Sequence, residues 1–294
     1  MHFGGNEKSS AQLHIMLGER DFAVSTQQQK AVLKAMFDTV SGGYDNGSLR
    51  FFTNSAAHMA ALLNLKGNEH ILDVACGTGN AAIAIAPLLP KGRIVAVDFS
   101  TGMIEQARAR IEALGIRNVE FLVRDMQHLD FPDGTFDSAV CAFGIFFVED
   151  MVAQLGHIIQ TVKPGGTAMI TNFEENYFYP LKELFFARLE SYGVQTPPQT
   201  WRRIAHEQGC RELFEKAGLR DIRVEKKNVG YFLADTGQWW DVVWNAGFRM
   251  MVGRLSPEDQ NRFKQEHLEE IDKLRTKDGI RLDVGVLFTS GTKP

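Results

Sequence analysis

The sequence predicts an α/β protein built on a doubly wound, mostly parallel sheet of seven strands. Between residues 70 and 173, five short apolar runs alternate with amphipathic stretches, which is typical of parallel strands joined by crossover helices. The runs are nearly continuous in Val, Ile, Ala and Phe, as expected of strands covered on both faces. Two later alternating segments, 220–235 and 282–291, can pair antiparallel and add an antiparallel edge strand to the sheet.

Turn and capping residues bound each of these elements. The five parallel strands are predicted at 70–75, 93–99, 119–124, 136–143 and 167–173. An alanine-rich helix over 80–89 follows the first strand, and Ser100 is placed to cap a helix that ends at Gly115. Pro and Gly predict turns at 131–137 (FPDGTFD) and at 163–166 (KPGG).

Outside these elements the sequence predicts helices that cover the sheet. Residues 1–65 are interpreted as a polar arm followed by two cover helices near 28–39 and 54–65. Residues 66–294 form the core, with helical insertions at about 174–218 and 236–280. The second insertion holds a Trp-rich helix and a helix opened by Ser256 and Pro257.

Composition and charge exclude several classes of function. The 294 residues carry 32 basic and 36 acidic side chains, with no basic run dense enough to follow a nucleic-acid backbone. The three cysteines are too scattered for a disulfide framework or a metal site. No secretory signal is evident, and no apolar segment reaches the roughly 18 residues of a membrane helix. We therefore expect a cytoplasmic protein with no metal, no nucleic-acid partner and no membrane span.

A glycine turn after the first predicted strand indicates a ligand site. The segment ILDVACGTGN (71–80) places Gly77 and Gly79 where backbone must approach a ligand without an intervening side chain. With Ala82 the pattern is G-x-G-x-x-A, which a dinucleotide site could share. The turn alone therefore does not choose between a nicotinamide cofactor and another nucleoside.

Acidic residues lie in or at the ends of the neighbouring strands. Asp98 ends the second strand, the expected place for a carboxylate that binds two ribose hydroxyls, although a turn or capping role is the alternative. Asp125 can accept from an exocyclic amine, with Met126 bordering a purine, or is another turn acid. Asp73 either meets a cationic group or anchors the loop without touching ligand. Because the carboxyl ends of parallel strands share one edge, the set predicts a nucleoside crevice.

Five motifs carry a resemblance to a known family. LDVACGTGN, VDFS, RDMQHLDFPDGTFD, AFGIFFV and VKPGG, in this order and spacing, resemble the class I S-adenosylmethionine-dependent methyltransferases, most closely their ubiquinone/menaquinone C-methyltransferase-like branch. The match covers residues 71–173 and, weakly, the upstream SGGYDNG. It implies a Rossmann-like fold, S-adenosylmethionine (SAM) as the cofactor and a small-molecule acceptor.

The resemblance also implies the residues that contact SAM. Asp98 would hold the ribose, Asp125 with Met126 the adenine, and Asp73 would lie near the amino group. The complete predicted set is Tyr44, Asp73, Ala75, Gly77, Gly79, Asp98, Phe99, Met103, Asp125, Met126, Ala142 and Phe143. Ala75 stands where many members of the family have a further glycine, although the quinone branch also tolerates alanine at that position.

Methyl transfer from a sulfonium requires alignment and exclusion of water more than a reactive side chain. Tyr44 and His206 are the candidate catalytic residues, and a base is needed only where the acceptor must lose a proton. The predicted acceptor walls are Phe146, Phe147, Tyr177, Phe178, Trp201, Trp240 and Trp244. For the Trp-rich helix the alternative is plain packing, since Trp240, Trp244 and Phe248 recur every four residues.

These walls favour a small and mostly apolar or aromatic acceptor, and the branch that the sequence resembles implies methyl transfer to carbon, or to oxygen. Arg202 and Arg203 keep a phosphorylated acceptor open. Two other functions share the glycine turn, an NAD(P)-dependent oxidoreductase and a SAM-binding regulatory protein without turnover. Against the oxidoreductase, a dinucleotide fingerprint strand does not usually carry an acid such as Asp73 just before its glycines. The oligomeric state is left open.

Overall fold

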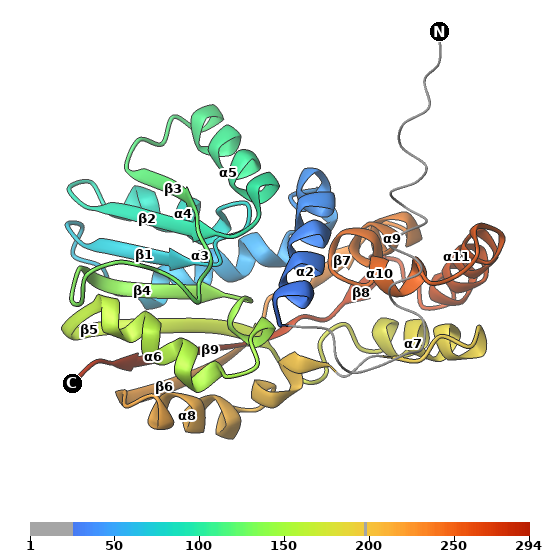
Figure 1. The fold of residues 1–294 in the computed structure, drawn as a ribbon. Coiled ribbons are helices and arrows are strands. Elements are labelled where there is room, and N and C mark those ends of the chain that lie inside the picture. Colours follow the sequence, from blue (N-terminus) through green and yellow to red (C-terminus); the bar gives the residue numbers. More distant parts are fainter. Residues whose placement is uncertain (1–25, 197–198) are drawn as a thin grey trace, which may run out of the picture.

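The computed structural model describes residues 26–196 and 199–294, and its centre is one seven-stranded sheet (Figure 1). The strand order is β3-β2-β1-β4-β5-β9-β6. The strands are β1 (His70–Val74), β2 (Arg93–Asp98), β3 (Val119–Val123), β4 (Phe136–Ala142), β5 (Val162–Phe173), β6 (Arg220–Asn228) and β9 (Gly285–Thr292). Strand β9 runs antiparallel to both of its neighbours. The predicted fold class is confirmed, with the antiparallel strand second from the edge and β6 outermost.

The strand order reverses direction between β1 and β4. From β1 the chain proceeds outward through β2 to β3, and it then returns to pair β4 on the other side of β1. Ile71, Leu72 and Val74 of β1 are completely buried, because this central strand is covered on both faces. Connections leave β1 and β4 in opposite directions, which opens a crevice at the carboxyl ends of these two strands.

Helices fill the connections at the predicted places. Those of the core are α4 (Asn80–Ile85), α5 (Thr101–Ala113), α6 (Met151–Thr161) and α8 (Glu207–Lys216), and those of the N-terminal segment are α2 (Thr26–Val40) and α3 (Phe51–Leu62). The Ser100 hydroxyl accepts a hydrogen bond from the Met103 N–H, and Gly115 adopts a φ of 67° just beyond α5. The sequence signals that begin and end this helix are therefore confirmed. The predicted N-terminal arm through residue 25 lies outside the described residues.

The remaining elements gather beyond the carboxyl edge of the sheet, with α2 between them and the strands (Figure 1). They are α7 (Leu181–Ser191), α9 (Thr236–Asn245), α10 (Arg249–Val252), α11 (Pro257–Asp272) and a two-stranded sheet of β7 (Tyr231–Leu233) with β8 (Ile280–Leu282). The Ser256 hydroxyl caps α11 as predicted, accepting from the Asp259 N–H. These elements form a cover over the crevice.

Three predicted elements have different bounds in the structure. The segment 220–235 is two strands in different sheets, broken beside Gly230, where a β-carbon would lie 2.2 Å from the Leu282 carbonyl oxygen. Strand β5 begins at Val162 and includes the predicted KPGG turn as an irregularity of register, with Gly165 at a φ of 78°. The Trp-rich helix ends at Asn245, because the chain turns at Gly247, whose φ is 98°.

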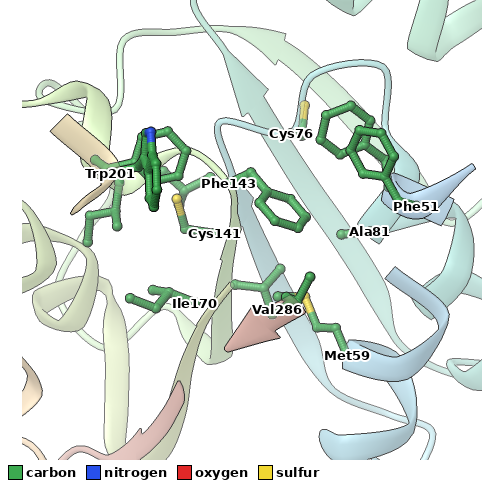
Figure 2. Packing of buried hydrophobic residues seen from close by; sticks show 14 of the residues in the cluster. Phe51, Met59, Cys76, Ala81, Cys141, Phe143, Ile170, Trp201 and Val286 are labelled. Atoms are coloured by element: carbon green, nitrogen blue, oxygen red, sulfur yellow. The ribbon is translucent and has the colours of Figure 1, made fainter. Parts of the chain in front are cut away.

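One continuous apolar core joins the sheet to its helices (Figure 2). Phe51 and Met59 of α3 belong to the same buried cluster as Ile170 of β5 and Val286 of β9. Trp201, from the 3-10 turn Thr200–Ile204, extends this cluster toward the cover. Within the described ranges, none of the helices combines the length and the apolarity that crossing a bilayer requires.

Candidate cofactor and acceptor site

A cavity of about 630 Å³ lies between the carboxyl edge of the sheet and the cover. Its size falls in the range of about 300–1,000 Å³ that encloses whole small molecules. Of the predicted SAM contacts, it is lined by Tyr44, Ala75, Gly77, Asp98, Phe99, Met103, Asp125, Met126, Ala142 and Phe143. Of the predicted acceptor walls, it is lined by Phe146, Phe147, Tyr177, Phe178 and Trp201.

The glycine turn has two glycines with different tasks. A β-carbon on Gly79 would lie 2.9 Å from Phe121 Cζ, so this glycine allows close packing, and it does not line the cavity. A β-carbon on Gly77 would meet no atom within 4 Å, because this residue faces the open cavity. Ala75, which stands where many members of the family have a glycine, has a positive φ of 54° and is accommodated beside Gly144, which leaves room for its methyl group.

The Asp98 carboxylate both accepts a hydrogen bond from the glycine turn and lines the cavity. Its Oδ2 accepts from the Gly77 N–H and its Oδ1 from the Ser100 N–H, both at 2.9 Å. Burial raises the pKa of this carboxyl, and the two backbone donors act against that rise. Each carboxylate oxygen has two acceptor positions, so the backbone bonds leave capacity for further donors.

Asp73 lies beneath the turn rather than in the cavity. Its side chain is completely buried, and its Oδ2 accepts from the Ala82 N–H at 3.1 Å. Its Oδ1 has no hydrogen-bond partner among the described residues. Burial raises the pKa of Asp73 to about 8. The geometry is that of an acid that anchors the loop, the alternative noted for this residue.

Helix α2 lies across the end of the cavity that Asp125 borders. Lys30 Nζ is 2.7 Å from Asp125 Oδ2, while the Gln127 N–H donates to Oδ1 of the same carboxylate at 2.9 Å. Farther along the helix, Asp38 accepts from the Ser100 hydroxyl at 2.6 Å, which attaches α2 to the start of α5. These long-range contacts close the cavity on this side.

Tyr44 and its neighbour fix the segment before α3 against the glycine turn. The Tyr44 ring stacks on Phe52 with centroids 4.8 Å apart, and burial raises the pKa of its hydroxyl. Asp45 forms a 2.8 Å ion pair with Arg110 and accepts from the Thr78 hydroxyl at 2.8 Å. Tyr44 therefore lines the cavity from a segment that is tied directly to the turn.

Several sequence-predicted residues lie elsewhere. Trp240 and Trp244 do not line the cavity, because they stack on each other and Trp240 packs on Phe263 of α11. These contacts favour the packing alternative for this helix. His206 points away from the cavity as well, since its side chain is 65% exposed and lies 2.7 Å from Glu175.

Arg202 and Arg203, which could favour a phosphorylated acceptor, do not line the cavity. The Arg203 guanidinium donates to the carbonyl oxygens of Phe146, Val148 and Glu149. It thereby holds the loop after β4 in place. Arg202 lies over the Trp201 ring, 5.7 Å from its centroid.

Sequence reasoning missed the contribution of α2 and of the corner between α9 and α10. Phe37 of α2 lies edge-on to Phe99 and Phe147, with centroid distances of 6.2 and 5.4 Å. A signal was present, because Leu33, Met36, Phe37 and Val40 form one apolar helical face, and all four line the cavity. The corner residues Asn245 to Met251 carry no comparable pattern.

The chain also contains three buried free cysteines, and burial raises the pKa of the Cys141 thiol to about 12. Within residues 26–196 and 199–294, no three His, Cys, Asp or Glu side chains are grouped as a metal site would require. The cavity chemistry that these residues offer is hydrogen bonding at one end and aromatic contact at the other.

The fold and the glycine-turn cavity define a class I methyltransferase, and comparisons with known proteins agree. A family profile described as a methyltransferase domain matches residues 71–166. The ubiquinone/menaquinone biosynthesis C-methyltransferase of Coxiella burnetii is 31% identical over 202 residues, which are 65% of this chain and 78% of that protein. The demethylmenaquinone methyltransferase of Bacillus cereus is 28% identical, over 69% of this chain and 94% of that protein.

Solved structures share the fold at low sequence identity. The YcgJ protein of Bacillus subtilis superposes with a TM-score of 0.55 at 19% identity, covering 81% of this chain and 97% of that one. Phosphoethanolamine N-methyltransferase 2 of Haemonchus contortus gives 0.56 at 17% identity, covering 92% and 61%. The chain belongs to the SAM-dependent methyltransferase family that includes the ubiquinone/menaquinone C-methyltransferases. It is therefore an enzyme whose cofactor is SAM, which removes the oxidoreductase and regulatory alternatives.

Proposed function

We propose that this methyltransferase transfers a methyl group to a ring carbon of a small, neutral aromatic acceptor of the hydroquinone type. The supporting observation is the aromatic end of the cavity, where Phe143, Phe146, Tyr177, Phe178 and Trp201 converge. Such walls favour a flat apolar ring, and none of these five side chains carries the positive charge that a buried phosphate would require. The relatives named for quinone methylation support the same class.

The polar end of the cavity fits the nucleoside part of SAM. We propose that Asp98 accepts from the ribose hydroxyls, that Asp125 accepts from the adenine amine beside Met126, and that Gly77 leaves room for the methionine part. The open space at Gly77 and the unused acceptor positions of Asp98 support this assignment. Asp73 has its place beneath the turn, where its bond from the Ala82 N–H holds the loop.

The protein's own contribution is alignment and exclusion of water. Bound SAM would supply an electrophilic methyl group: the ring carbon's electron pair would form the new C–C bond, the C–S pair would stay on sulfur, and the ring C–H proton would be released to solvent when the site opens. Phe37 and Phe147 close the cavity from α2 and from the loop after β4. Tyr44 and Phe143 border the region between the cofactor and acceptor ends. Holding two reactants in line in a dry site is a major source of rate enhancement.

The experiment is a product analysis with methyl-labelled SAM. A prenylated naphthohydroquinone, kept reduced, should yield S-adenosylhomocysteine and a ring-methylated product, with the labelled carbon assigned by NMR. Phosphoethanolamine is the charged comparison acceptor and should yield neither. Methylation of a ring oxygen would overturn the assignment to carbon, and turnover of phosphoethanolamine would overturn the acceptor class.

A further inference from the structure

A buried lysine lies behind the aromatic wall of the acceptor end, outside the residues assigned so far. Lys182, in the first turn of α7, has a side chain only 2% exposed. Its ammonium donates to the Glu175 carbonyl oxygen at 2.8 Å. It also lies over two aromatic rings, 4.1 Å from the Tyr177 centroid and 5.0 Å from the Trp201 centroid. Both rings line the acceptor cavity.

The Tyr177 ring is enclosed on its faces and free at its hydroxyl. Phe173 stacks on it with centroids 4.4 Å apart and an interplanar angle of 19°, while Trp201 meets it edge-on at 4.8 Å. The phenol oxygen has no hydrogen-bond partner among the described residues, although the ring is 6% exposed. Burial raises the pKa of this hydroxyl, so it remains a proton donor at neutral pH. Because Tyr177 lines the cavity and its hydroxyl is not engaged by another described residue, it can donate to an oxygen of a bound acceptor.

The positive charge on the buried side of this corner is that of Lys182, because Arg202 is exposed. Lys182 and Arg202 both lie over the aromatic wall, Arg202 at 5.7 Å from the Trp201 centroid. The facing acids are Glu183, 3.7 Å from the ammonium and 45% exposed, and Glu175, which is engaged by His206. Because Glu183 is largely solvated, it offsets the buried charge of Lys182 only partly.

We propose that Tyr177 and Lys182 form an oxygen-binding corner of the acceptor site, in which the tyrosine hydroxyl donates to a ring oxygen and the ammonium stabilises negative charge on it. This inference rests on the proposed function and narrows its acceptor to a phenol-type ring that reacts as the phenolate. The acceptor O–H proton passes to water, and the electron pair that it leaves raises the nucleophilicity of the ring carbon. Lys182 is a positioning residue, since it acts through the Tyr177 ring, and no side-chain base is then required.

A nitronaphthol indicator tests this corner without turnover. Its phenolate absorbs visible light, so its pKa can be measured when it is bound to the protein saturated with S-adenosylhomocysteine. We expect binding to lower the indicator pKa by about one unit, as an opposite charge nearby does. Lys182→Met should abolish the shift and Lys182→Arg should retain it. Tyr177→Phe should weaken binding about tenfold, the loss of one charge-assisted hydrogen bond.

Lys264→Met is the matched control, because Lys264 lies 5.1 Å from the Trp240 centroid in a similar contact outside the cavity. It should leave the indicator pKa as in the wild type. An unchanged shift in Lys182→Met, an unshifted indicator, or no saturable binding would overturn the proposal. The proposal would also be overturned if Lys264→Met changed the indicator pKa as much as Lys182→Met does. A shift that persists although no hydroquinone is methylated would instead refute the proposed function and leave the corner standing.

Discussion

The Gly77 N–H donates to Asp98 Oδ2 at 2.9 Å, which ties the turn after β1 to the end of β2 at the wall of the cavity. The register that places Val74 beside Val97 brings these two residues together, because β1 and β2 are parallel neighbours. One carboxylate thus orders the loop and faces the space in which a ribose is expected. In the proposed site, this single side chain would couple the geometry of the loop to cofactor binding.

The two glycines of the turn should respond differently to the same substitution. Both have positive φ, so alanine costs about 1–2 kcal/mol of backbone strain at either position. Gly77→Ala adds a methyl group to the cavity and should lower SAM affinity at least about tenfold with a modest fall in Tm. Gly79→Ala also collides with Phe121 and should lose several degrees more in Tm. Calorimetric titration measures the SAM affinity of each variant, and thermal unfolding measures its Tm. Equal losses of affinity and of Tm in the two variants would refute the different roles of these glycines.

Asp73 should make the stability of the free protein depend on pH. Between the ordinary pKa of 3.8 and the raised value of about 8, the folded state retains a proton that the unfolded state has released. The free energy of unfolding contributed by this group therefore falls as pH rises through that window. Asp73→Asn has no such proton, so its stability relative to the wild type should rise between about pH 5 and pH 8. Denaturant unfolding at several pH values measures this difference, and parallel curves would contradict it.

Substitutions at two tryptophans should distinguish a residue that lines the cavity from one that only packs α9 against its neighbours. Trp201→Ala removes a cavity wall and should raise the acceptor KM about tenfold or more while SAM affinity is kept. Trp240→Ala removes a contact with Phe263 and should lower the free energy of unfolding by about 1–3 kcal/mol without changing the acceptor KM. Steady-state kinetics beside unfolding curves tests both variants. A higher acceptor KM in Trp240→Ala would mean that α9 does face the substrate.

Lys30 should contribute to cofactor retention through Asp125. Lys30→Met breaks the 2.7 Å contact between α2 and Asp125 in the loop after β3, and should weaken SAM binding about two- to fivefold. Lys34→Met is the control on the same helix, since Asp38 keeps its bonds from Ser100 and Gly102 without it. Stopped-flow measurement of S-adenosylhomocysteine release should show faster release for Lys30→Met alone. Equal rates in both variants would remove this role.

The core and much of the site were predictable because local patterns specify them. The glycine turn, the Ser100 cap and the acids at the strand ends are each visible within a few residues of sequence. The Lys30 contact with Asp125 joins residues 95 positions apart, and no local pattern predicts it. Trp240 shows a related limit. Helical spacing predicts which residues share one face of the helix, but it does not predict that this face packs on Phe263. The breaks at Gly230 and Gly247 likewise depend on tertiary contacts and backbone geometry.

Calorimetric titration of SAM into Asp98→Ala tests the central assignment most directly. Asp137→Ala is the matched control, because Asp137 accepts the His70 N–H at 2.8 Å and does not line the cavity. With circular dichroism confirming both folds, Asp98→Ala should lose at least about a hundredfold in affinity, as two bonds to a charged acceptor disappear. Asp137→Ala should bind SAM as the wild type does. Wild-type affinity in Asp98→Ala would contradict the proposal that this carboxylate holds the cofactor.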